Sequence, residues 1–403
     1  MLKSEDINSS LQKIVLGLSD GSSRSNLLDR FIQHGLPNNK NEEYKFTPIG
    51  QSLSKSTDWI NDLTKQASQT GQPEPIPGTI PIALLGGVPL NIPTQLPEGL
   101  SIYTDNHDWS VNLEDPFALL NGAMRKSTLV IKASKPIDQV IHLDHLPCSV
   151  SFAGSIKIVV LKDSSLSIIE TLPTNGSDFC NLSLSAEVQE SASLNFAVQQ
   201  STASTLNVVY NASIRQASDS RTETFTLTTD GGIVRNNFKY LVDGESAEAN
   251  VFGLYLIGGK TLADNHTVVD HLVPNANSNE LFKGIMADQS RGIFNGKIFV
   301  RQDAQKTNAF QSNRNILLSD KATVNTKPQL EIWADDVKCF HGCTTGQLDD
   351  NAMFYLRSRG IDRKSAQAML LNAFAVEVVE RINHPFIREW ASKKVAEKIS
   401  ILG

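Results

Sequence analysis

The 403-residue sequence is poor in cysteine and in long apolar segments, and each shortage excludes a class of protein. Its four cysteines, Cys148, Cys180, Cys339 and Cys343, are too few for a disulfide framework in a chain of this length. A membrane-spanning helix needs about 18 apolar residues, whereas the most apolar short run, Ile80–Leu90, is interrupted by proline and glycine. The N-terminus lacks the basic start and apolar stretch of a secretory signal peptide. We therefore expect a cytoplasmic protein with reduced thiols and no membrane contact.

The charge balance also excludes a class of partner. The net charge is -6 and the pI is near 5.8, whereas nucleic-acid binding depends on Lys and Arg side chains that neutralise phosphates. We therefore expect no nucleic-acid partner. The length predicts two or three structural units. Cys148 and Cys180 stand alone in apolar, strand-like contexts, which predicts core or surface positions without chemistry.

Residues 1–125 form the first of three zones, which we expect to be helical and then irregular. The segments Ser9–Leu18 and Leu27–His34 have helical apolar spacing, and Gly35 is a typical helix stop. Gln72–Glu98 is rich in proline and glycine, which excludes a long helix there.

Residues 126–345 form the second zone, in which the apolar period changes to two. Short β-rich runs occur at Thr128–Ile131, Ser155–Leu161, Ser165–Ile169, Ser193–Val198, Thr224–Leu227, Gly296–Val300 and Gln329–Trp333. Small polar turn residues separate these runs. The pattern demands an all-β architecture, which leaves a sandwich pair, a propeller or a β-solenoid. The similar segments at Leu166 and Leu194, 28 residues apart, slightly favour stacked solenoid coils.

Residues 346–403 form the third zone, which is helical. Asp349 or Asp350 can cap a first helix that Gly360 ends, and Asp362 can cap a longer second helix. Asn383-His384-Pro385 separates the second helix from a third. The second helix is apolar around much of its circumference over Ala366–Val379, so we expect it to be buried within the protein or against a partner.

The densest group of chemically active side chains is Cys339, His341 and Cys343. In a strand the three project to one face, and two sulfurs with an imidazole suit iron–sulfur or zinc chemistry. The outer two Cα atoms of a strand this long are roughly 13 Å apart at about 3.3 Å per residue, so both sulfurs reach one metal only if the chain turns at Gly342. The alternative is two small apolar residues and a hydrogen-bonded histidine at a strand end.

Other candidate motifs are weaker. Gly258–Thr261 ends like a phosphate-binding P-loop, but Leu254 stands where the first glycine belongs, so we interpret the segment as a turn. A set of acidic and histidine residues could bind a metal or form an acid–base pair, or could be the polar face of a strand; it comprises Asp264, His266, Asp270 and His271. Neither a Gly-x-Ser-x-Gly nor a His-Glu-x-x-His motif is present, so we expect a protein that is not an enzyme.

Five segments together match a known family pattern. Asp335–Gly342 reads Asp-Asp-Val-Lys-Cys-Phe-His-Gly, and Phe354–Ile361 follows it at the expected place. Gly292–Lys297 and Thr326–Ile332 match upstream, and Asn41–Thr47 is similar to Asn-Glu-Glu-Trp-Lys-Tyr-Thr. These segments resemble the SufD proteins of the SufB/SufD family, which are scaffolds of iron–sulfur cluster assembly. SufB itself fits less well, because its cysteine-bearing strand near the end of the β region is not matched.

The resemblance implies a right-handed parallel β-helix core over 126–345, an N-terminal helical region over 1–125 and a C-terminal helical bundle over 346–403. It also implies partners: SufB through the β-helix, the ATPase SufC on the C-terminal helices, and a second copy of the chain when it is alone.

The resemblance further assigns site residues. The family's functional histidine maps onto His341, which would face a SufB cysteine and receive or ligate the nascent cluster, and Cys339 is the motif cysteine. Cys343 stands where many members carry a small residue, so its role stays open. The resemblance implies transient iron or a transient cluster and no stably bound cofactor. Two rival hypotheses are a β-helix carbohydrate-active enzyme and a stable zinc protein built on Cys339, His341 and Cys343.

Overall fold

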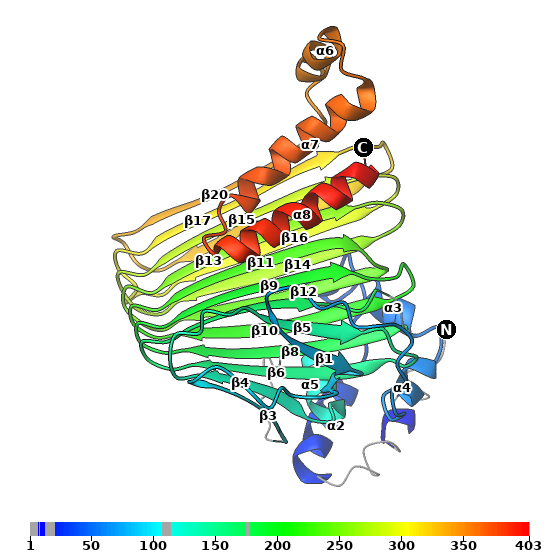
Figure 1. Ribbon diagram of the computed structural model, residues 1–403, viewed down its shortest axis with the longest axis vertical. Helices are drawn as coiled ribbons and strands as arrows, with labels where there is room; N and C mark the ends of the chain where they lie inside the picture. Colours follow the sequence, from blue (N-terminus) through cyan, green and yellow to red (C-terminus); the bar gives the residue numbers. More distant parts are fainter. Residues whose placement is uncertain (1–6, 8, 13–20, 107–113, 175–177, 403) are drawn as a thin grey trace.

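The alternating segments of the middle of the chain form a β-solenoid whose coils stack in parallel (Figure 1). The computed structural model describes residues 7, 9–12, 21–106, 114–174 and 178–402. Each coil contributes strands to two sheets, and strands on successive coils pair in parallel, so neighbouring coils satisfy each other's backbone hydrogen bonds. The expected fold class, a parallel β-solenoid flanked by N-terminal and C-terminal helices, is confirmed.

The strands fall into two sheets. In spatial order, sheet 1 contains β2 (Val88–Pro89), β1 (Ile80–Leu85), β5 (Ile141–Leu146), β7 (Ser165–Thr171), β9 (Ser193–Ser201), β11 (Arg221–Asp230), β13 (Glu248–Ile257), β15 (Asn277–Met286), β17 (Asn308–Leu317) and β20 (Lys338–Gly346). Sheet 2 contains β18 (Thr323–Thr326), β19 (Gln329–Ile332), β16 (Arg291–Val300), β14 (Leu262–His271), β12 (Ile233–Val242), β10 (Asn207–Gln216), β8 (Phe179–Val188), β6 (Phe152–Val160), β4 (Thr128–Ala133) and β3 (Leu100–Asp105), with β18 and β19 both beside β16. The repeat is confirmed, because Leu166 lies opposite Leu194.

Mostly small polar residues build the turns where a strand of sheet 2 passes to the next strand of sheet 1. A residue with positive φ recurs in these turns, at Asp163, Ser191, Asp219, Ser246, Asn275 and Lys306. Asp, Asn and Ser suit such positions because their short polar side chains hydrogen-bond locally. The turns also stack, since the Asp163 N–H donates to the Glu190 carbonyl and the Ser191 N–H to the Ser218 carbonyl. Gly258–Thr261 is likewise part of a turn, between β13 and β14, as interpreted from the sequence.

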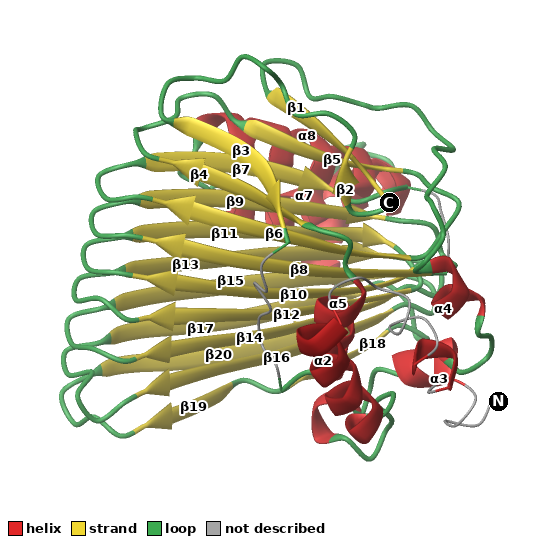
Figure 2. Cartoon of the chain, turned by 90° about the horizontal axis from the view of Figure 1, so that it is seen from below, coloured by secondary structure: helices red, strands yellow, loops and turns green. Residues whose placement is uncertain are grey.

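The interior of the solenoid is mainly apolar in its first coils and becomes more polar toward its last ones. Alternate side chains of each strand face inward. Cys148 and Cys180 lie in the apolar part of this core, which is one of the two placements that the sequence left open. The buried inner residues of the last coils are more polar and include Glu280, Gln311, Asn313 and Asn315. Figure 2 shows the two sheets as stacked layers of strands.

Besides the helical residues 9–12, five helical elements are found among the described residues of the N-terminal region, and they pack beside the solenoid (Figure 2). They are α2 (Gly21–His34), η1 (Glu42–Tyr44), α3 (Ile49–Leu53), α4 (Asp58–Asp62) and α5 (Pro116–Met124). Gly35, with φ at 68°, follows α2 as predicted. Of the helix expected over Ser9–Leu18, residues 9–12 are helical; the remainder lies outside the described residues.

This region also contains strands that the sequence did not indicate. The stretch rich in proline and glycine, expected to be irregular, supplies β1 and β2, and β3 lies beside β4. Pro81 is tolerated in β1 because the Ile80 N–H donates toward the β5 side, so the nitrogen of Pro81 faces the side where β1 has no partner at that position.

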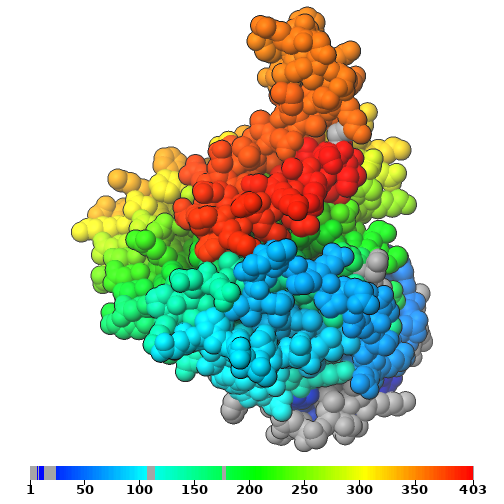
Figure 3. Space-filling view, viewed as in Figure 1, coloured from blue at the N-terminus to red at the C-terminus, as the bar shows by residue number. Residues whose placement is uncertain are grey.

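Three helices follow the solenoid: α6 (Asp350–Ser358), α7 (Arg363–Val379) and α8 (Pro385–Leu402). The predicted caps are confirmed, since the side chain of Asp349 accepts hydrogen bonds at the start of α6 and that of Asp362 at the start of α7. Helices α7 and α8 lie across the outer face of sheet 1, whereas α6 projects away from the body (Figures 1 and 3). No described helix combines the length and the hydrophobicity needed to cross a membrane.

Candidate functional site

The strand that carries the candidate residues is the last strand of sheet 1. β20 pairs with β17 on one side, and the described residues provide no strand for its other side. Nearly every residue of β20 is exposed. An unpaired strand edge presents free N–H and C=O groups and is a template for pairing with another chain. The site therefore lies at an open end of the solenoid.

The three candidate side chains share the inner face of β20, as predicted from strand alternation. Their register partners on β17 are Ala309 for Cys339, Gln311 for His341 and Asn313 for Cys343. These three β17 residues are buried inside the solenoid. Cys339, His341 and Cys343 thus form the last inner layer of the solenoid, above a buried layer and exposed to the end.

Within this chain the two sulfur atoms do not converge on one metal. β20 continues through Gly342 without the turn that convergence would require. Among the described residues, no three His, Cys, Asp or Glu side chains lie close enough to hold a metal ion. Any iron or cluster held by these residues needs further ligands from outside the chain.

The three side chains differ in their readiness to bind iron. Cys339 is partly buried against the apolar core, and burial raises the pKa of its thiol, so the thiol keeps its proton at neutral pH. His341 is exposed and has no hydrogen-bond partner in the part of the chain that the structure describes. Cys343 is exposed, with its Sγ 2.8 Å from Thr326 Oγ1 of β18. Of the three candidate side chains, the imidazole of His341 therefore needs the least rearrangement to bind a metal.

Exposed aromatic residues surround the open end. Phe340 is 65% exposed and stacks on Phe310 of the preceding coil, with ring centroids 5.7 Å apart. Trp333, which follows β19, is also exposed and stacks on Phe299 of β16. Large apolar side chains on a surface that also offers an unpaired strand edge are typical of a protein interface.

A second exposed apolar surface lies on α6 and α7. The largest exposed side chains there are Phe354, at 75%, and Tyr355 of α6, together with Met369 of α7. None of the residues of α6 is buried. Helix α7, by contrast, is held firmly to sheet 1: Lys283 donates from its Nζ to the Phe374 carbonyl at 2.8 Å and to the Glu377 carboxylate.

The acidic and histidine candidates on β14 do not form one site. Asp270 accepts two hydrogen bonds of 2.8 Å from Arg301. His271 faces inward to Ser278. Asp264 and His266 do meet, but their partners are residues that the sequence did not single out individually.

Asp264 and His266 belong to a buried network that fastens the N-terminal segment to sheet 2. Asp264 accepts from Arg235 at 2.6 Å and from Thr47. His266 lies between Asp264 and Glu43, 2.9 and 3.2 Å from their carboxylates. The hydrogen bond from His266 lowers the pKa of Glu43. Residues of the segment Glu42–Thr47 therefore contact several successive coils, which is a structural role.

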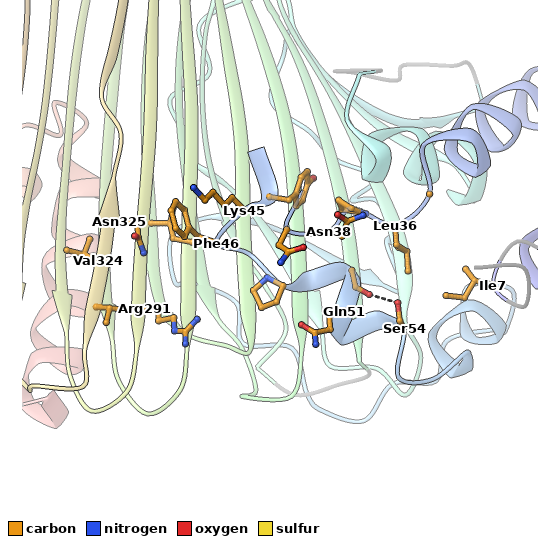
Figure 4. Close-up of a pocket in the computed structure, with 18 residues that line it drawn as sticks. Ile7, Leu36, Asn38, Lys45, Phe46, Gln51, Ser54, Arg291, Val324 and Asn325 are labelled. Carbon is orange, nitrogen blue, oxygen red and sulfur yellow. Dashed lines mark hydrogen bonds between the residues drawn. The ribbon is translucent and has the colours of Figure 1, made fainter. Parts of the chain in front are cut away.

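The same segment borders a cleft of about 970 Å³ on the outside of the solenoid (Figure 4). The N-terminal segment lines it with Lys45, Phe46 and Gln51, and the solenoid with Arg291 and Asn325. None of the three candidate residues of β20 lines it. The cleft and the β20 site are thus separate features.

The fold and the site together define a class. It is an open-ended parallel β-solenoid with a Cys-x-His strand at its end and three helices, α6–α8, beside it, which we call the helical arm. The comparisons agree, since residues 148–374 match the family model described as the SufBD core domain of SUF-system FeS cluster assembly. The chain belongs to this family and is SufD-like.

Curated relatives support this assignment. The chain is 37% identical to the iron-sulfur cluster assembly protein SufD of Escherichia coli over 183 residues, 45% of this chain and 43% of that protein. It is 32% identical to the SufBD family protein slr0076 of Synechocystis over 282 residues, 66% and 62% of the two chains. It is 28% identical to the chloroplastic protein ABCI7 of Arabidopsis thaliana over 336 residues, 79% and 70% of the two chains. The match thus spans less than two thirds of the first two relatives.

Proposed function

We propose that the chain is the scaffold subunit that pairs with a SufB-type protein through the open end of its solenoid, so that a nascent iron–sulfur cluster forms between the two. The observation that carries this proposal is the exposed strand β20, which presents Cys339 and His341 beside an unpaired edge. The exposed rings of Phe340 and Trp333 would form the apolar part of the contact.

The residues of β20 have distinct roles in this proposal. His341 offers a neutral ring nitrogen to iron and faces a thiolate of the partner. Cys339 must lose its proton before it can bind iron, because only the thiolate is a ligand. The cluster is cargo, and we propose no stably bound cofactor. Cys343, with its hydroxyl neighbour Thr326, is a candidate further ligand.

The helical arm is the second half of the proposal. Phe354, Tyr355 and Met369 form an exposed apolar surface that suits the ATPase SufC. ATP hydrolysis is then the reaction of SufC, and this chain hydrolyses nothing. Because α7 is anchored to sheet 1 by Lys283 and Glu377, a force on the arm is transmitted to the coils next to β20 and opens the SufB interface. A cytoplasmic location stays a prediction.

Co-purification of the full-length chain with SufB and SufC from the same organism tests both contacts. Truncation of the arm is a poor design, because α7 and α8 cover core residues of sheet 1 such as Leu254 and Leu281. We expect Phe354→Asp to lose SufC and keep SufB, and Phe340→Asp to lose SufB and keep SufC. Ile401→Asp, at an equally exposed apolar position of α8, is the matched control. Retention of both partners by both variants would contradict the assigned surfaces.

The isolated chain provides a further check. Without SufB, the same open end is free to pair with a second copy, so we expect a homodimer that Phe340→Asp converts to a monomer in analytical ultracentrifugation. The carbohydrate-active alternative has no remaining support, since the chain belongs to a cluster-assembly family.

A further inference from the structure

Two buried polar residues lie directly below His341 inside the solenoid. Glu280 of β15 is the register partner of Gln311 of β17, and Gln311 is the register partner of His341. All three stand on inner positions of successive coils, about 4.8 Å apart per strand. The next inner position down the column is Val251, which belongs to the apolar core. Glu280, Gln311 and His341 therefore form a short column of polar side chains, which begins at Glu280 and ends at the open end of the solenoid.

The side chain of Gln311 is oriented by Glu280. Its Nε2 donates to Glu280 Oε2 at 2.6 Å, and both residues are almost fully buried. A carboxyl oxygen that accepts this bond selects the amide nitrogen, so the carbonyl oxygen of Gln311 must point elsewhere. That oxygen is buried and has no donor among the described residues. A buried acceptor without a donor is unfavourable, so its presence in a native protein calls for an explanation.

Gly296 of β16 makes room for this amide. A Cβ atom at Gly296 would lie 2.3 Å from the Nε2 of Gln311, so any other residue would push the amide out of place. Burial raises the pKa of Glu280 to about 7, and the hydrogen bonds from Thr267 and Gln311 oppose this rise only in part. In either protonation state Oε2 remains available to hold the amide of Gln311.

A hydrogen-bond donor for the Gln311 carbonyl oxygen is available on the next strand, where His341 is the register partner of Gln311. A neutral imidazole carries one N–H, and His341 has no other partner in the described chain. We propose that Gln311, held by Glu280, is the positioning residue of His341: its carbonyl oxygen accepts the imidazole N–H and leaves the other ring nitrogen free toward the open end. Histidines that bind metals almost always donate their second nitrogen to such an acceptor, which fixes the tautomer.

Nitrogen NMR of the full-length chain labelled with [15N]histidine tests this inference directly. At pH 8.5 the two ring nitrogens of His341 should show the shifts of a single tautomer; His341→Gln assigns the signals. Gln311→Met removes the acceptor at similar volume, and Gly296→Ala displaces the amide while leaving Gln311 in place. Both should shift the His341 signals toward the averaged values of a free imidazole.

Gln200→Met is the matched control, since Gln200 is an equally buried inner amide in a distant coil. It should leave the His341 signals unchanged, and circular dichroism should show that all variants are folded. Unchanged signals in folded Gln311→Met would overturn the proposal, and so would an equal shift in Gln200→Met.

Only the expected effect on cluster assembly rests on the proposed function; the hydrogen bond between Gln311 and His341 does not. If His341 binds the nascent cluster, Gln311→Met should reduce cluster assembly by the complex about 10- to 100-fold. Full assembly in His341→Ala would defeat the proposed function and leave the NMR result standing. Free-imidazole signals of His341 in the wild-type chain would defeat the inference and leave the function standing.

Discussion

Replacement of Asp264 by asparagine should release the N-terminal segment from the solenoid. Asp264 is fully buried and accepts from Arg235, whose side chain is 2% exposed, at 2.6 Å. Its other partners are His266 and Thr47. Asp264→Asn keeps the size and an acceptor oxygen but removes the charge, so the guanidinium of Arg235 is left buried without its counter-ion.

Removal of one member of a buried ion pair costs about 3–5 kcal/mol. Thr47 and the Glu43 carbonyl, which accepts from Arg235, both belong to the N-terminal segment. The loss should therefore appear as local opening of Glu42–Thr47, measured by hydrogen exchange of a peptide that covers it. A loss of about 3 kcal/mol corresponds to roughly 100-fold faster exchange.

The control is the exposed pair of Arg215 and Asp243, 2.7 Å apart. Asp243→Asn should cost less than about 1 kcal/mol. Burial opposes ionisation of Asp264, but His266 and Arg235 outweigh it and hold its pKa at about 2, so the difference between Asp264→Asn and wild type should persist from pH 8 to pH 4 and fade only below that. An effect of Asp264→Asn no larger than that of Asp243→Asn would refute the reasoning.

Three further predictions concern stability. Burial lowers the pKa of His271 to about 4 from 6.5, so neutral His271 contributes its full stability above pH 6.5 and the wild type loses that stability as the pH falls toward 4. In denaturant titrations, His271→Gln should lose about 3 kcal/mol less than the wild type over this range. Glu280 has a raised pKa, about 7 against 4.5, so the wild type loses stability as the pH rises and this carboxyl ionises. Between pH 5 and pH 8, Glu280→Gln should therefore gain about 3 kcal/mol in free energy of unfolding relative to the wild type. A difference between the two proteins that does not change with pH would show that the carboxyl is not desolvated. Leu371 of α7 is fully buried, so Leu371→Ala should cost about 2–5 kcal/mol in denaturant unfolding, and a cost below about 1 kcal/mol would mean that α7 is not part of the core.

The solenoid and its helical arm could be predicted because their signals are local. Alternation along each run, small polar turn residues and the repeat of Leu166 at Leu194 each depend on neighbouring residues alone. The same holds for the caps at Asp349 and Asp362. The strands near Pro81 escaped prediction, because whether a proline fits a strand depends on which edge is paired, and that is a tertiary property.

The site was predictable in part for the same reason. Strand alternation placed Cys339, His341 and Cys343 on one face, which the structure shows. The residues beneath them, Gln311 and Glu280, could not be connected to His341, because register across coils is not visible in one sequence. A signal existed, since the segment Asn308–Asn315 alternates without an apolar phase, which is unusual for a buried strand.

The acid–base hypothesis shows that closeness in sequence does not place side chains in one site, as for Asp264, His266, Asp270 and His271. Proximity in sequence suggested one site, but strand alternation sends His271 inward and the other three outward. Two of the outward residues then find partners more than two hundred residues away, such as Glu43 for His266 and Thr47 for Asp264.

The most direct test of the central claim is cluster assembly by the complete complex of this chain with SufB and SufC, in which His341 is replaced by alanine. The account predicts that His341→Ala still co-purifies with both partners and still supports ATP hydrolysis by SufC, but that the complex accumulates no iron–sulfur absorbance. Cluster formation at the wild-type rate in that complex would contradict the claim that β20 presents the cluster ligand.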